Sequence, residues 1–143
     1  MKKNIIRITI IFIIIVGGFI TYELYLKRTP EKILLSQFGI SLKGYNYSII
    51  SNKEQWDYNG DGYCLILIDL AKFRPDDFKN IVNPNFLKLP IIDKIETNEI
   101  PEFYLKGQNG YYLLELEKED SHDFKIFIIN TDTKKAILYY QIM

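Results

Sequence analysis

The sequence predicts an α+β protein. It consists of an N-terminal transmembrane helix and one small domain with a roughly five-stranded, mainly antiparallel sheet and two short helices, in the order α-β-β-α-β-β-β. Three observations lead to this prediction: an uncharged apolar run near the amino terminus, several strand-length apolar or alternating segments, and short polar turns between the last three of them. Short connections between successive strands favour antiparallel pairing.

The amino-terminal segment has the pattern of a membrane anchor. A basic head precedes an uncharged run from Ile8 to Tyr22, and two further cations follow it closely. Crossing a bilayer takes about 20 apolar residues, a length that residues 5–26 reach if the guanidinium of Arg7 extends to the lipid headgroups. We therefore expect residues 5–26 to form a transmembrane helix with the membrane as its partner.

This anchor divides the chain into two parts. Residues 1–28 are expected to be an N-terminal membrane anchor or uncleaved signal, and residues 29–143 an extracytoplasmic α+β domain. The excess of cations before the apolar run favours a cytoplasmic amino terminus, so the expected location is the cell membrane, crossed once. Two alternatives stay open: a signal peptide cleaved near Val16–Gly18, and a buried helix of a cytosolic protein.

The charge distribution argues against one class of partner. Residues 29–143 carry 13 basic and 17 acidic residues, a net charge of −4 that the neutral whole chain conceals. Binding to nucleic acid needs clustered lysine and arginine, so we expect no nucleic-acid partner. The single cysteine, Cys64, cannot form an intrachain disulfide, and the domain therefore depends on its apolar core.

The first half of the domain predicts a helix and a hairpin. Thr29 can cap a helix, Pro30 suits its first turn, and Gly39 can end it. Residues 45–56 alternate as a strand does, whereas residues 63–70 are apolar on both faces, as in a central strand. The turn-forming residues between these two segments predict that they pair as a hairpin.

The second half predicts a short helix and a meander. Residues 75–82 begin with proline and carry two acids in the first turn, which is typical of a helix start. Residues 111–117, 124–129 and 136–142 are apolar segments separated by polar turns, and they are expected to form three successive antiparallel strands.

The segment from residue 84 to residue 109 is the expected binding surface. Three prolines interrupt it, and spaced acids follow its apolar pieces. An irregular segment of this length is unusual in a compact domain, unless it contains an edge strand near residues 103–105 or serves a function. Apolar side chains within an acidic rim would bind a protein partner through their burial. The expected partner-binding residues are Phe86, Leu87, Phe103 and Tyr104.

A second candidate site lies in the turn between the first two strands. Asp57, Asn59 and Asp61 alternate before a glycine, which resembles the first half of an EF-hand calcium loop. Leu65 and Ile68 stand where such a loop has further ligands, and neither has a side-chain oxygen. A hairpin turn explains the same residues, because Asn and Gly tolerate positive φ. A Ca²⁺ site stays open as the alternative.

The sequence contains no complete catalytic or cofactor set. His122 lies in a charged loop between Ser121 and Asp123, and the side chains of adjacent residues point apart rather than toward one proton path. Cys64 falls in a strand expected to be buried, where a thiol is inert. One cysteine and one histidine cannot form a zinc site, and no glycine-rich phosphate loop precedes a helix. These features favour a protein that is not an enzyme.

Three functions are compatible with these observations. The first is a non-enzymatic module that binds a protein or the cell envelope. The second is an immunity-type inhibitor of a toxin, which small size, tethering and mild acidity support. The third, from a different class, is a calcium-dependent envelope enzyme or binding module.

Overall fold

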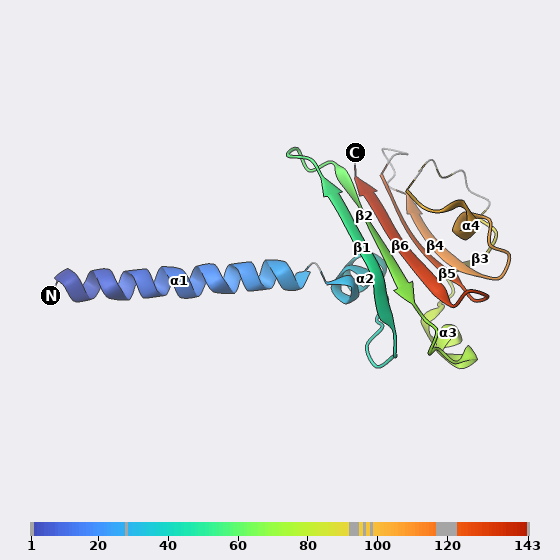
Figure 1. Ribbon diagram of the computed structural model, residues 1–143, viewed down its shortest axis with the longest axis horizontal. Helices are drawn as coiled ribbons and strands as arrows, with labels where there is room; N and C mark the ends of the chain where they lie inside the picture. Colours follow the sequence, from blue (N-terminus) through green and yellow to red (C-terminus); the bar gives the residue numbers. More distant parts are fainter. Residues whose placement is uncertain are drawn as a thin grey trace.

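The computed structural model describes residues 2–27, 29–91, 95, 97, 99–116 and 123–142; in the first helix it places the side chains of residues 7 and 9–22. Its centre is a six-stranded sheet in the order β1-β2-β6-β5-β4-β3, with every neighbouring pair antiparallel (Figure 1). The strands are β1 (Ser48–Trp56), β2 (Gly62–Asp69), β3 (Leu87–Lys88), β4 (Gly110–Leu116), β5 (Phe124–Asn130) and β6 (Lys135–Ile142). The helices are α1 (Lys2–Lys27), α2 (Pro30–Phe38), α3 (Pro75–Ile81) and α4 (Glu102–Leu105).

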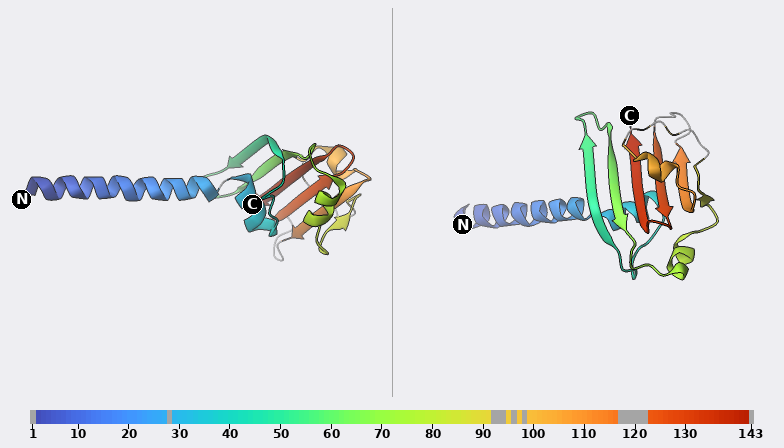
Figure 2. Two further views of the ribbon diagram at one scale, coloured as in Figure 1. Left: turned by 90° about the horizontal axis from the view of Figure 1, so that it is seen from below. Right: turned by 45° about the vertical axis from the view of Figure 1, so that its right-hand side comes forward.

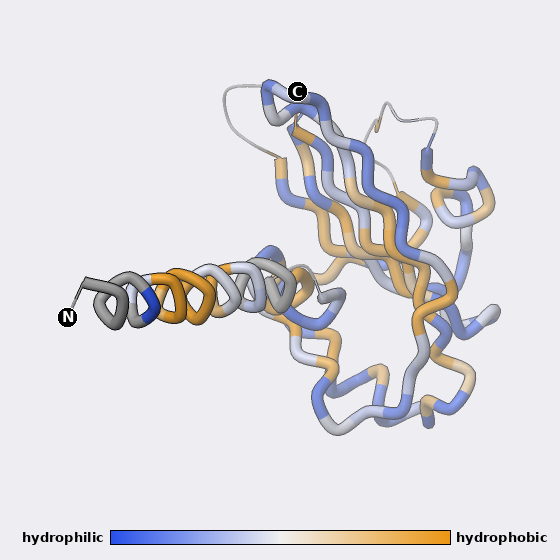
Figure 3. The backbone as a smooth tube through the Cα atoms, turned by 60° about the vertical axis from the view of Figure 1, so that its left-hand side comes forward, coloured by the Kyte–Doolittle hydropathy of each residue, from blue (hydrophilic) through white to orange (hydrophobic). Residues whose placement is uncertain are grey.

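The first helix, α1, extends away from the sheet (Figures 1 and 2). Its side chains from Thr9 to Tyr22 are exposed, and the isoleucines among them form the strongly hydrophobic part of the helix in Figure 3. Within the helix, the Thr21 hydroxyl donates a hydrogen bond of 2.9 Å to the Gly17 carbonyl.

The prediction of a transmembrane helix over residues 5–26 is wrong. A search of the described residues for a bilayer-crossing helix finds none with both the necessary length and the necessary apolar character. The predictions of a signal anchor, of a single-pass topology and of a location in the cell membrane depended on that helix, and they are corrected with it.

The predicted count of roughly five strands is also corrected. The expected hairpin is present as β1 and β2, and the meander as β4, β5 and β6. The sixth strand, β3, pairs Leu87 with Tyr112 and Lys88 with Tyr111. Two residues show no periodicity, so the sequence pattern could not reveal this strand. Residues 103–105, where the sequence left room for an edge strand, belong instead to the short helix α4.

The last strand joins the two halves of the sheet. β6 lies between β2 and β5, so the carboxyl-terminal strand closes the gap between the hairpin and the meander. Strand order of this kind depends on contacts between distant parts of the chain, which the local pattern does not contain.

Both faces of the sheet are covered. Leu34 of α2 and Phe78 of α3 pack in the core on one face, and Tyr104 of α4 packs in the core on the other. Figure 2 shows α2 and α4 on opposite sides of the strands. Because side chains alternate along a strand, Leu138 of β6 belongs to the first core and its neighbour Tyr139 to the second.

The prolines and the glycine predicted at the ends of α2 and α3 are in place, but the Thr29 side chain makes no capping hydrogen bond to α2. Pro30 and Pro75 occupy the first turns of the two helices. Gly39 ends α2 with a left-handed φ of 66°, and its N–H donates to the carbonyl oxygens of Leu34 and Leu35.

Candidate functional site

Two adjoining hollows lie where one end of the sheet meets α3. Their volumes are about 240 Å³ and about 270 Å³, and they share Tyr111 and Thr131. We name the two together the Tyr111 groove. The first hollow is lined also by Lys88, Leu89, Gln108, Asn109 and Gly110, and the second by Phe73, Pro75, Phe78, Lys79 and Lys134.

The strands β3 and β4 position the centre of the groove. Lys88 is the cross-strand partner of Tyr111, so the two side chains lie on the same face of the sheet. Gly110 begins β4 with φ at 147°, and a Cβ atom there would overlap the carbonyl oxygen of Ile129. The backbone beside Tyr111 therefore requires glycine.

Aromatic rings line the floor of the groove. Phe73 and Phe78 are 3% and 8% exposed, and their ring centroids are 5.4 Å apart. Tyr45 stacks on Phe73 with the centroids 5.3 Å apart, and Tyr111 is half-buried beside them. Because Phe73 and Phe78 are already almost fully buried, Tyr111 is the ring of these three that leaves apolar surface for a ligand side chain to cover.

A hydrogen-bonded ion pair holds the start of α3. The backbone N–H of Arg74 donates to Oδ2 of Asp77 at 2.8 Å, and the guanidinium Nη2 donates to Oδ1 at 3.2 Å. These bonds from Arg74 lower the pKa of the Asp77 carboxyl below its ordinary value. Asp77 is therefore ionised at neutral pH and fixes the helix that carries Phe78 and Lys79 to the groove.

The turn between β5 and β6 forms the opposite wall. Nδ2 of Asn109 donates to both carboxylate oxygens of Asp132, at 3.1 Å and 3.0 Å. The backbone N–H of Thr131 donates to the Asn109 carbonyl at 3.1 Å, and that of Leu70 donates to the Lys134 carbonyl at 2.8 Å. The two bonds between Asn109 and Asp132 and the one between Thr131 and Asn109 thus join the loop before β4 to the turn after β5.

Three lysines are among the residues that line the groove: Lys79, Lys88 and Lys134. Lys79 forms an ion pair of 3.3 Å with Asp76, and both of those side chains are largely exposed. In the part of the chain that the structure describes, Lys88 and Lys134 form no ion pair. The groove therefore presents positive charge on a domain, residues 29–143, whose net charge is −4.

The structure does not bring the four expected partner-binding residues together. Phe86 and Tyr104 are 8% and 1% exposed, and they belong to the cores on opposite faces of the sheet. Leu87 and Phe103 are 53% and 52% exposed. The segment from 84 to 109 therefore covers the sheet with some side chains and presents others to solvent.

The loop proposed for calcium closes the β1–β2 hairpin. The Asp57 N–H donates to the Asp61 carbonyl at 2.7 Å, and the Gly60 N–H donates to the Asp57 carbonyl at 3.1 Å. Gly60 has φ at 96°, and Nδ2 of Asn59 donates to Oδ2 of Asp61 at 2.5 Å. Among the residues described, no group of three or more His, Cys, Asp or Glu side chains is arranged to hold a metal ion. The Ca²⁺ site stays a prediction.

The remaining candidate for chemistry is a buried thiol. Cys64 is fully buried, and burial, with a smaller contribution from the charge of Glu54, raises its pKa to about 12. Its Sγ lies 3.9 Å from Oδ1 of Asn52. A thiol in this state is not a nucleophile at neutral pH. His122 lies outside the described residues.

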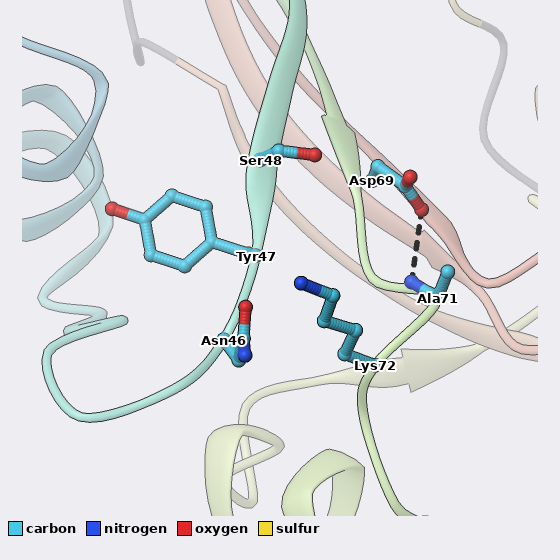
Figure 4. Close-up of a pocket in the computed structure, with 6 residues that line it drawn as sticks. All are labelled: Asn46, Tyr47, Ser48, Asp69, Ala71 and Lys72. Atoms are coloured by element: carbon cyan, nitrogen blue, oxygen red, sulfur yellow. Dashed lines mark hydrogen bonds between the residues drawn. The ribbon is translucent and has the colours of Figure 1, made fainter.

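Two other hollows lie on either side of Tyr47. One, of about 60 Å³, is the polar site in Figure 4, where Oδ1 of Asp69 accepts a hydrogen bond of 2.8 Å from the Ala71 N–H. The other, of about 420 Å³, is lined by α2 and the loop before β1. There the Tyr47 hydroxyl donates to Glu31, which lowers the pKa of Glu31, while burial raises the pKa of Tyr47. The first hollow has room for about two water molecules.

The sequence pattern did not predict the residues of the groove as a site. Phe73, Lys88, Tyr111 and Lys134 come from four separate segments, and only the sheet topology brings them together. The one partial signal is that Lys88 falls within the segment from 84 to 109. Comparison of the chain with protein-family models, with curated proteins and with solved structures found no match.

Proposed function

We propose that residues 29–143 form a non-enzymatic protein-binding module whose partner contacts the Tyr111 groove. The observation that carries this proposal is the combination of an aromatic floor, made by Phe73, Phe78 and Tyr111, with a rim of lysines from three different elements. Aromatic side chains at the centre and polar ones around them are the usual arrangement of a protein interface.

The shape of the groove favours a polypeptide over a small molecule. Small-molecule sites enclose most of their ligand. Here the two hollows are both open to solvent and adjoin at Tyr111 and Thr131. An extended segment can follow both hollows and place a side chain in the one above Phe78.

The lining of the groove favours binding over catalysis. The described residues that line it include neither a histidine nor a cysteine nor a carboxylate. The lysines, Tyr111 and Thr131 of the lining belong to residue types that can act as acids, bases or nucleophiles, but the lining includes no histidine, cysteine or carboxylate to pair with them. No observation on the described residues specifically favours an immunity-type inhibitor or a calcium-dependent module. We therefore propose neither function.

Site-specific photo-crosslinking in the cells of origin tests this proposal. In the full-length chain, the variant Lys134→p-benzoylphenylalanine should give a covalent adduct of defined mass with another polypeptide after irradiation. The same replacement at Lys53, which is exposed on β1, is the matched control and should give none. The absence of an adduct at position 134, or equal adducts at both positions, would overturn the proposal.

A further inference from the structure

The charged groups around the Tyr111 groove point to the chemistry of its partner. Resting on the proposed function, we infer that the segment entering the groove is acidic and carries one large apolar side chain. Charge complementarity and the aromatic floor each contribute to this inference.

The positive charges of the groove come from three separate segments of the chain. Lys79 of α3 and Lys134 of the turn between β5 and β6 line the hollow that contains Phe73 and Phe78, and Lys88 of β3 lines the adjoining one. Each ammonium group lies on a flexible side chain and can reach a carboxylate at more than one position of a bound segment. A segment that occupies both hollows therefore lies within reach of lysines from all three segments.

The carboxylates near the groove already have partners. Asp132 accepts two hydrogen bonds from Asn109, and Asp77 is paired with Arg74. Asp76 pairs only with Lys79, and that pair is weak because both side chains are exposed to water. Lys88 and Lys134, which form no ion pair in the described residues, are thus available to an acidic partner.

The floor sets the second requirement. A purely acidic segment would place only polar groups over the exposed part of Tyr111 and against the apolar lining of the hollow that contains Phe73 and Phe78, and it would gain little from them. A phenylalanine or leucine side chain in the hollow of about 270 Å³ would remove apolar surface from water on both partners. We therefore expect acidic residues on either side of one such side chain.

Titration with short designed peptides tests the inference. The probe is a peptide of glutamates around one central phenylalanine. One comparison peptide has alanine at the centre, and another has lysines in place of the glutamates. Chemical-shift changes of backbone amides in the full chain should centre on Tyr111, Thr131 and Lys134 for the probe. Affinity should fall at least about tenfold for either comparison peptide, and it should weaken as salt is added.

Charge-reversal variants supply the second arm. Lys88→Glu combined with Lys134→Glu should weaken binding of the probe by at least about tenfold, because two attractive charges become repulsive. Lys53→Glu with Arg7→Glu makes the same change in net charge on β1 and α1, away from the groove (Figure 1), and should stay within about twofold of the natural sequence. All four of these side chains are exposed, so thermal unfolding should be unchanged in both double variants.

Three results would overturn the inference: equal binding of the lysine peptide, shifts that map outside the groove, or equal losses in both double variants. A crosslinked partner at position 134 without binding of the acidic probe would remove the acidic class and leave the proposed function standing. The absence of both would remove the proposed function as well.

Discussion

Two buried ionisable side chains respond in opposite ways to their surroundings. Cys64 is enclosed by apolar residues, so burial raises its pKa to about 12. Asp77 accepts a backbone N–H and a guanidinium from Arg74, so its pKa falls. Burial alone therefore does not determine the charge of a residue; the donors and acceptors that face it do.

The Cys64 thiol should be unreactive in the folded protein. At neutral pH, Ellman's reagent should release almost no chromophore from the native chain, because only the thiolate attacks and the thiol is both buried and protonated. In concentrated urea the same sample should release one equivalent. Rapid release without urea would contradict the enclosed position of Cys64.

Ionisation of the Asp77 carboxylate should make the stability of the folded chain fall at acidic pH. The pKa of Asp77 in the folded chain lies below its value of about 3.9 in the unfolded chain. The ionised carboxylate therefore contributes fully to the stability of the folded chain above about pH 3.9, and this contribution is lost as the pH falls through the folded-state pKa. The variant Asp77→Asn should therefore unfold at a lower temperature than the natural sequence at pH 7, and the difference should narrow below about pH 4. Thermal unfolding at a series of pH values measures this.

The neighbouring residue provides the control for that experiment. Asp76 pairs with Lys79 in an exposed ion pair, which water screens strongly. Asp76→Asn should change the unfolding temperature less than Asp77→Asn at pH 7. Equal effects of the two changes would mean that the Arg74 hydrogen bonds do not hold α3.

Among the elements, β4 depends on the backbone of its first residue. Gly110 has φ at 147°, and no side chain fits between it and the carbonyl of Ile129. Gly60 also has a positive φ, at 96°, but open space surrounds it. A side chain at Gly60 would meet only an unfavourable backbone conformation, whereas a side chain at Gly110 would also meet a steric overlap. Comparing substitutions at the two positions therefore distinguishes the free-energy cost of each effect.

The variant Gly110→Ala should lower the free energy of unfolding by more than Gly60→Ala does. An L-residue in the left-handed region costs about 1–2 kcal/mol, which is the effect expected at Gly60. At Gly110 the overlap with a paired strand adds to the strain, so the loss should exceed about 3 kcal/mol. Urea unfolding of the three proteins measures both values. Equal losses would contradict the close approach of β4 to β5.

The sequence predicted those elements that have a local signal. The β1–β2 hairpin and the β4–β5–β6 meander follow from apolar runs separated by turn residues. The strand β3 and the helix α4 have two and four residues, too few to show a period. The apolar run of α1 suggested a membrane span, but no helix among the described residues is both long enough and apolar enough to cross a membrane.

At the level of the whole molecule, the sheet separates two cores. Ile66 of β2 belongs to one core, and Ile126 of β5 belongs to the other. Ile128 and Ile137 face each other across β5 and β6 within one core. The tertiary arrangement, and with it the Tyr111 groove, arises from such long-range pairings, so the sequence pattern contained its parts but not their assembly.

Substitutions in different cores should act independently. Ile66→Val and Ile126→Val should each lower the free energy of unfolding by about 0.5–1.5 kcal/mol, and the double variant should equal the sum within about 0.5 kcal/mol. Ile128→Val with Ile137→Val, in contact across one face, should depart from the sum by more than that. Urea unfolding provides all six values. Strong coupling between Ile66 and Ile126 would contradict the separation of the cores by the sheet.

The strand β1 has β2 on one side and, among the described residues, no strand on its other side. Lys53 and Glu54 occupy the middle of this nine-residue strand and are both exposed. A second copy that docked alongside would have to strip water from both charges, which discourages growth of the sheet into a fibril. The two charges on β1 therefore disfavour the addition of a strand from a second copy at this edge of the sheet.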